Sequence, residues 1–101
     1  MALNVELRDE RGEVLLTVAG DGLLERLCQY AGDDGHSNCL RWVDPYGVTM
    51  FNALQAWALA NELGIMRPRV SGAEEAFLIE VLELTWRCVL GVRLYIWCVS
   101  G

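Results

Sequence analysis

Apolar and polar residues alternate in the first part of the chain. Residues 3–8 (LNVELR) place an apolar side chain at every second position, which is the period of a half-buried strand. The turn-forming residues 9–12 (DERG) follow, and a second apolar run covers residues 14–18. The pattern therefore predicts a β-hairpin over residues 3–19.

Two later segments change to the helical period. Residues 23–31 carry apolar side chains on one face and charged ones on the other, and Gly32 provides a stop. Residues 50–63 form a second, more apolar segment between Thr49, a plausible N-cap, and Gly64, a plausible stop. Each of the two segments is predicted to be a helix.

A third helix is predicted over residues 73–90. The preceding Ser71-Gly72-Ala73-Glu74 matches a capping box, in which serine and glutamate bond each other's backbone amides. The segment is apolar nearly all round, apart from a strip through Glu80, Glu83 and Arg87. Such a helix is normally buried on two sides, so we expect it between the sheet and another helix, or at a subunit interface.

Two further strands complete the expected fold. Residues 39–43 (CLRWV) and residues 92–99 (VRLYIWCV) are short, apolar and rich in aromatic or β-branched side chains. The predicted order is ββαβααβ. We therefore expect a single α+β domain over residues 1–101, with a mainly antiparallel four-stranded sheet packed against helices and residues 73–90 as the central helix.

The corner after the third predicted strand is the first candidate site. Asp44-Pro45-Tyr46-Gly47 suits a type I turn, and this chemistry accounts for the aspartate, the proline and the glycine. It does not require Tyr46, nor Asn52 and Gln55 in the following helix, which share a polar stripe with Glu62. The stripe is interpreted either as the solvent face of that helix or as a recognition surface.

Composition and charge narrow the function classes. Hydrophobic residues make up 53% of the chain, more than a small soluble domain usually buries, so some apolar surface is expected to meet a second copy or a foreign protein. The net charge of −6 argues against binding to nucleic acids or anionic membranes; it fits a basic partner, although solubility alone is the more common reason for such a charge. No apolar run is long enough for a membrane span, and no secretory signal opens the sequence. We expect a cytoplasmic protein with reduced thiols.

The sequence offers little chemistry. Cys28, His36 and Cys39 do not have a standard zinc spacing, and a Cys–His nucleophilic pair would require neighbours in sequence to adopt a demanding geometry. The helix carboxylates are typical of a solvated strip, and no phosphate-binding glycine motif is present. We predict no enzyme activity, no metal and no cofactor.

Residues 43–55 (VDPYGVTMFNALQ), together with GVRLYI at 91–96, resemble a pattern in small uncharacterised bacterial proteins. In that pattern a strand ends in DPYG, a helix with T-x-F-N-x-L-Q follows, and an aromatic-rich strand closes the chain. In size, charge and style of fold the chain also resembles small acidic immunity proteins of bacterial toxin systems. The second resemblance implies a non-enzymatic inhibitor that occludes a toxin, and it assigns no binding residues.

The leading hypothesis is therefore a protein-binding module, most concretely an immunity protein for a basic toxin domain. Two alternatives remain open: a structural or regulatory homodimer, and a small ligand-binding or enzymatic domain using His36 and nearby acids. Trp57 could be an anchor at the edge of the contact face, although a core position suits a tryptophan better. The candidate partner-binding residues are Tyr46, Asn52, Gln55 and Glu62 on one face, with Asp33, Asp34 and His36 in the polar loop.

Overall fold

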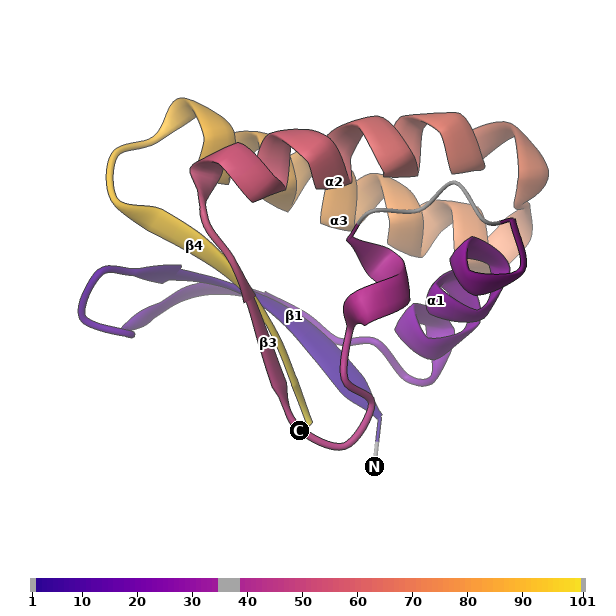
Figure 1. The fold of residues 1–101 in the computed structure, drawn as a ribbon, viewed down its shortest axis with the longest axis horizontal. Helices are drawn as coiled ribbons and strands as arrows, with labels where there is room; N and C mark the ends of the chain where they lie inside the picture. Colours follow the sequence, from indigo (N-terminus) through magenta and orange to yellow (C-terminus); the bar gives the residue numbers. More distant parts are fainter. Residues whose placement is uncertain (1, 35–38, 101) are drawn as a thin grey trace.

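The computed structural model describes residues 2–34 and 39–100. They confirm the predicted α+β class and the ββαβααβ order (Figure 1). Two short 3-10 helices, η1 and η2, lie in the connections. The elements are β1 (Leu3–Asp9), β2 (Val14–Val18), α1 (Leu23–Asp34), η1 (Leu40–Trp42), β3 (Val48–Phe51), α2 (Ala53–Met66), η2 (Arg67–Arg69), α3 (Gly72–Leu90) and β4 (Leu94–Ser100).

The four strands form one antiparallel sheet in the order β2-β1-β4-β3. The central pair joins the two ends of the described chain, since Leu3 lies opposite Ser100 and Asp9 lies opposite Leu94. Both ends therefore lie at the same end of the sheet (Figure 1). The predicted hairpin is confirmed as β1 and β2, whose register shifts between Leu7 and Arg8. The two edge strands are β2 and β3.

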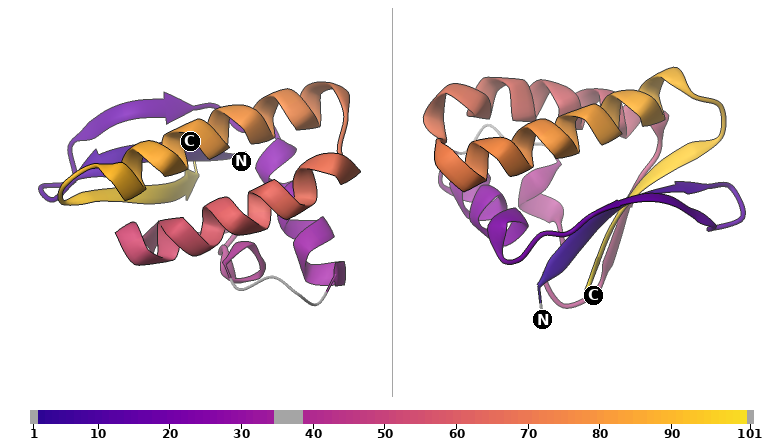
Figure 2. Two further views of the ribbon diagram at one scale, coloured as in Figure 1. Left: turned by 90° about the horizontal axis from the view of Figure 1, so that it is seen from above. Right: turned by 180° about the vertical axis from the view of Figure 1, so that it is seen from behind.

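The helices lie on one side of the sheet, and the other side has no covering element in either view (Figures 1 and 2). On the covered side, alternate residues of the strands point into the core, as the two-residue period requires. Helix α3 packs against the sheet and alongside α2, which agrees with its nearly all-round apolar character. Fully buried side chains of this core include Leu3, Val5, Leu27, Leu59, Leu63, Leu78, Cys88 and Ile96.

The third strand is not where the sequence pattern placed it. Residues 39–43 contain the 3-10 helix η1, in which Leu40 and Val43 are buried while Trp42 is exposed. A spacing of three between buried residues suits a 3-10 turn better than a strand. The strand lies after the corner instead, in β3, where Phe51 faces the core and Val48 and Met50 face outward. The corner therefore joins η1 to β3 and not a strand to a helix.

The helix boundaries also shift. Helix α2 begins after Asn52, so Thr49 is a strand residue and not the N-cap, and the helix continues through Gly64 to Met66. Helix α1 likewise continues past Gly32. Helix α3 begins after Ser71, as predicted, but the serine side chain makes no capping hydrogen bond. The Glu74 carboxylate that the capping box requires instead accepts hydrogen bonds from Arg26 and Tyr30 of α1.

Candidate protein-binding surface

The corner is a side-chain-stabilised turn. Asp44 Oδ1 accepts a hydrogen bond from the Tyr46 amide at 2.8 Å, and the Asp44 amide donates to Thr49 Oγ1 at 2.9 Å. The Gly47 amide donates a hydrogen bond to the Asp44 carbonyl oxygen at 3.5 Å, which closes the turn. Tyr46 projects from this turn and is 95% exposed, which agrees with its predicted outward direction.

Asn52 and Gln55 have a local structural role that the sequence analysis missed. Asn52 Oδ1 accepts from the Gln55 amide at 2.9 Å, and Gln55 Oε1 accepts from the Asn52 amide at 3.0 Å. These reciprocal bonds are a complete capping box for α2. The available signal was the three-residue spacing of two amide side chains before an apolar helical run. Helix formation therefore accounts for both residues without a partner.

Unlike the exposed Tyr46, Glu62 makes an internal contact. Its side chain is half-buried against η1, where Glu62 Oε1 accepts a hydrogen bond from the Leu40 amide at 3.3 Å. Burial, together with a smaller contribution from the hydrogen bond and charge of Glu62, raises the pKa of the Cys39 thiol to about 12. The carboxylate thus holds η1 against α2. The polar stripe predicted for Asn52, Gln55 and Glu62 is divided between capping and internal anchoring.

The predicted polar loop is described only in part. Asp33 and Asp34 belong to the last turn of α1, so the backbone there is helical where a loop was expected. His36 lies outside the described residues. The two aspartates are thus placed by their backbone alone, on a different element from Tyr46.

The outer side of α2 and α3 carries exposed apolar side chains that the sequence analysis did not group. Seen from above, these two helices run side by side and nothing is drawn over them (Figure 2, left). On α2, Leu54, Trp57 and Ile65 are 80%, 52% and 66% exposed. Spacings of three, eight and eleven residues put them on one side of the helix, over a length of about 16 Å. We call this surface the helical face; its residues are Leu54, Trp57, Ile65, Ile79, Trp86 and Leu90.

Two tryptophans join the two helices within the helical face, toward the end that carries Leu54 and Leu90. The rings of Trp57 and Trp86 meet edge to face, with their centroids 5.5 Å apart and their planes at 90°. Leu90 lies one helical turn after Trp86 and is 82% exposed. A paired and partly exposed tryptophan presents a large rigid apolar area, which is typical of residues that dominate binding energies at protein interfaces.

Polar groups are sparse on this surface. Asn61 lies between the exposed apolar residues of α2, and its Nδ2 donates to the Trp57 carbonyl oxygen at 3.1 Å. On α3, the charged residues Glu80, Glu83 and Arg87 lie beside Ile79, Trp86 and Leu90 and follow one border of the helical face. The helical face therefore has an apolar centre with charge at its border, which is the arrangement found in protein interfaces.

The uncovered side of the sheet is a weaker candidate. Val48 and Met50 are exposed there, but the Arg8 guanidinium covers the Trp97 ring with its centre 4.3 Å from the ring centroid. The same guanidinium bonds Glu6, with Arg8 Nε donating to Oε1 at 2.9 Å. Polar side chains of the protein thus occupy the middle of this surface, whereas the helical face has no comparable cover.

The four cysteines provide no reactive nucleophile at neutral pH. Burial raises the pKa of Cys28, Cys39 and Cys98 to about 12 and that of Cys88 to about 11. All four are free thiols, and the protonated thiol is a poor nucleophile. Across residues 2–34 and 39–100, His, Cys, Asp and Glu side chains do not gather in threes that could hold a metal ion.

Among the described helices, none combines the length and apolar character needed to cross a membrane. In the comparisons with known proteins, no family model, no curated protein and no solved structure matches the chain.

Proposed function

We propose that this protein is a non-catalytic protein-binding module that engages its partner through the helical face. The observation that carries the proposal is the partly exposed Trp57–Trp86 pair, with Leu54 and Leu90 beside it, on a side of the fold that no other described element covers. Exposed apolar surface of this kind is costly in water, so burying it against a partner is favourable.

In its most concrete form, the proposal is a cytoplasmic immunity protein that neutralises a basic bacterial toxin by occluding it. The net charge of −6 would accelerate the encounter with a basic partner and help to orient it. The tryptophan pair would then supply most of the affinity, because a few buried aromatic residues dominate the energy of most interfaces. Inhibition requires no chemistry from the immunity protein in this mechanism.

A homodimer is the second candidate, and Asn61 favours it. This residue lies in the middle of the exposed stripe of α2, between Trp57 and Ile65. A single asparagine within an apolar helix seam commonly sets the register of two identical helices. In a two-fold pair of α2 helices, Asn61 would meet its own copy.

The test is binding to the products of neighbouring open reading frames, produced together with this protein. Leu54→Glu is the first variant, since a glutamate in the first turn of α2 is compatible with the helix dipole and should leave the fold intact. Trp57→Ala is the second, and we expect it to weaken binding by about thirtyfold, the effect of a typical hot-spot residue. Tyr46→Ala is the matched control, because it removes an exposed aromatic ring outside the helical face.

The outcomes separate the candidates. Loss of binding and of protection against toxicity in the Leu54 and Trp57 variants, with Tyr46→Ala unchanged, supports the proposal. If Tyr46→Ala alone loses partner binding, the binding site is at the corner and not on the helical face. If no neighbouring product is toxic or co-purifies, the immunity proposal fails. Light scattering then tests the second candidate, for which the wild type should be a dimer and Leu54→Glu a monomer.

A further inference from the structure

Strand β2 is an edge strand whose protection is limited to a bulge at Leu15, where its register against β1 shifts. It occupies one end of the sheet order, so alternate residues direct backbone N–H and C=O groups away from β1. Its sequence, VLLTV, contains no charged residue and no proline, and Val14, Leu15 and Leu16 are all exposed. Natural proteins usually protect such an edge with lysine, proline or a covering element, because it can pair with another strand.

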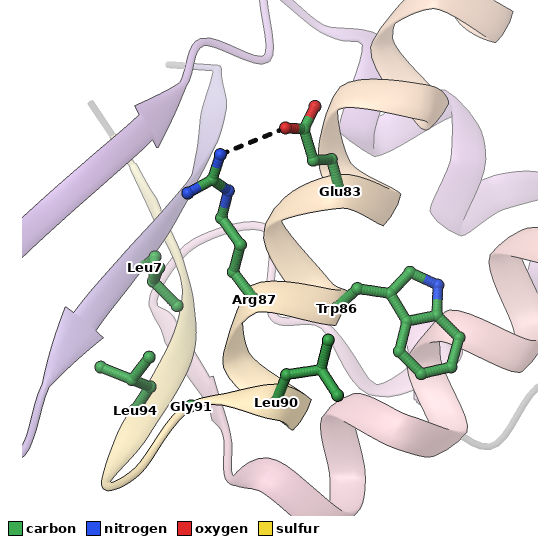
Figure 3. A pocket seen from close by; sticks show the side chains of 7 residues that line it. All are labelled: Leu7, Glu83, Trp86, Arg87, Leu90, Gly91 and Leu94. Atoms are coloured by element: carbon green, nitrogen blue, oxygen red, sulfur yellow. Dashed lines mark hydrogen bonds and ion pairs between the residues drawn. The ribbon is translucent and has the colours of Figure 1, made fainter.

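A groove lies between this edge and helix α3. One part, of about 290 Å³, is lined by β2 on one side and by α3 on the other, with Leu16, Val18 and Leu84 as its apolar residues. A second pocket, of about 560 Å³, continues along the same flank of α3 toward Leu7 and Leu94 (Figure 3). The two share Glu83 and Arg87, so they are adjoining parts of one groove.

The charges along the α3 wall are not equivalent. Arg87 Nη2 contacts Glu83 Oε1 at 3.3 Å, one helical turn apart, and this pair is drawn in Figure 3. Glu80 lies one turn before Glu83 in the same groove, and within the described part of the chain it has no ion-pair partner. The groove thus offers one carboxylate whose charge no neighbouring cation balances.

From these observations we propose that the β2–α3 groove binds an extended segment of a partner protein, which adds to β2 as a further strand. Its alternate side chains would rest on Leu16, Val18 and Leu84, and a lysine or arginine would face Glu80. Main-chain hydrogen bonds provide affinity in this mode of recognition, and side-chain pockets provide specificity. The part of the groove that β2 lines contains none of the residues of the helical face, whereas the second part borders that face through Trp86 and Leu90.

A second copy of this chain fits the groove less well. Two β2 strands paired about a two-fold axis would bring the α3 walls of both copies to the same seam, so that Glu80 and Glu83 would approach their own counterparts. Like charges facing one another in an interface oppose association. The unbalanced carboxylate instead favours a foreign segment that carries positive charge.

The probe is a synthetic peptide of alternating valine and threonine, with an arginine at each end so that either strand direction can place a cation near Glu80. Two further versions carry backbone N-methyl groups on the odd or on the even residues. In strand addition only one of these sets of amides faces β2, so one version should lose at least about tenfold in affinity and the other less than about threefold. Equal effects of the two sets would overturn the proposal.

Two protein variants test the charge and the location. Glu80→Gln should weaken binding of the arginine peptide by about three- to tenfold at low salt, and a peptide with glutamate ends should bind more weakly still. The control, Asp44→Asn, makes the same charge change at the corner beside the opposite edge of the sheet and should have no effect. Amide hydrogen exchange should slow in β2 and not in β3. Slowing in β3 alone, or no binding of the arginine peptide, would refute the assignment.

Trp57→Ala keeps the two proposals distinguishable. It should leave binding of the arginine peptide unchanged, because Trp57 lines neither part of the groove and its neighbour Trp86 lines only the second part, away from β2 and Glu80. A loss of partner binding in Trp57→Ala with retained peptide binding supports two separate surfaces. Loss of peptide binding in this variant would mean that the peptide binds the helical face, and it would refute the groove.

Discussion

Removing the Asn52 side chain tests whether this residue is in the sequence for folding or for recognition. Asn52→Ala deletes the Oδ1 acceptor that bonds the Gln55 amide at 2.9 Å. It leaves the Asn52 amide in place as a donor to Gln55 Oε1. Because both groups are exposed, the freed Gln55 amide can bond water, and the larger penalty for a buried unpaired donor does not apply. We expect a loss of about 1 kcal/mol in the free energy of unfolding, the usual cost of an N-cap asparagine changed to alanine.

Urea unfolding followed by tryptophan fluorescence measures this loss. With a urea m-value of about 2 kcal/mol/M, the midpoint should fall by about 0.5 M, and the melting temperature by about 4–8 °C for a domain of this size. Asn52→Asp keeps an acceptor and places a negative charge at the helix N-terminus, so its stability should equal or exceed that of the wild type. Asn61→Ala, in the middle of the same helix, controls for loss of an exposed amide and should change stability by less than about 0.5 kcal/mol.

A midpoint for Asn52→Ala within error of the wild type would refute the capping explanation. So would an equal loss in Asn61→Ala, since the effect would then not depend on the cap. Partner binding of the same variants is the second measurement. If Asn52→Asp folds normally but loses the partner, Asn52 contributes to recognition as well as to the helix.

Two further predictions concern glycines and thiols. Gly20→Ala should destabilise the fold by about 3 kcal/mol or more, because the new Cβ would lie 1.8 Å from the Leu3 carbonyl oxygen. Gly64→Ala, in open space within α2, should stabilise the fold by about 0.5–1 kcal/mol. The urea midpoint should therefore fall for Gly20→Ala and rise for Gly64→Ala, and a shift of both midpoints in one direction would contradict the explanation. Since folding raises the thiol pKa values from 9.0 to about 11 or 12, stability is unaffected below pH 9 and is lost as pH rises from 9 toward 12. The slope is up to about 1.4 kcal/mol per pH unit for each thiol. Ellman's reagent should react slowly with the native protein at pH 8 and fast with the protein in denaturant. Fast reaction under both conditions would show that burial does not protect the thiols.

The parts of the fold that the sequence predicted correctly have strong local patterns. Residues 3–18 alternate cleanly around a turn, and α3 is a long apolar segment between two glycines. The third strand was misplaced because residues 39–43 and 48–51 are equally short and apolar. Tertiary contacts decide between them: β3 pairs with β4, whereas the Leu40 amide bonds Glu62 instead of a neighbouring strand. Neither contact is visible in a local window of sequence.

The candidate site was harder to predict because it depends on how two helices are oriented. Tyr46 could be placed outside from the turn alone, since a type I turn fixes the direction of its third residue. The spacing of Asn52 and Gln55 also fits a capping box, but Thr49 is a second candidate for the N-cap of α2 in the sequence. The helical face was not readable, because α2 has apolar residues on every side. Only the position of α3 determines that Ala56 and Leu63 are inside while Leu54 and Ile65 are outside.

The pairing of β1 with β4 has a consequence for the order in which the protein can assemble. The centre of the sheet joins residues near opposite ends of the sequence, and β3 pairs with β4 alone. Until β4 has been synthesised, β1 has only its hairpin partner β2, and β3 has no strand beside it. The core face of the sheet is therefore incomplete until β4 has been made, and until then the apolar sides of α2 and α3 have no complete sheet to pack against. Before β4 pairs, the nascent chain therefore exposes more apolar surface than the native protein does.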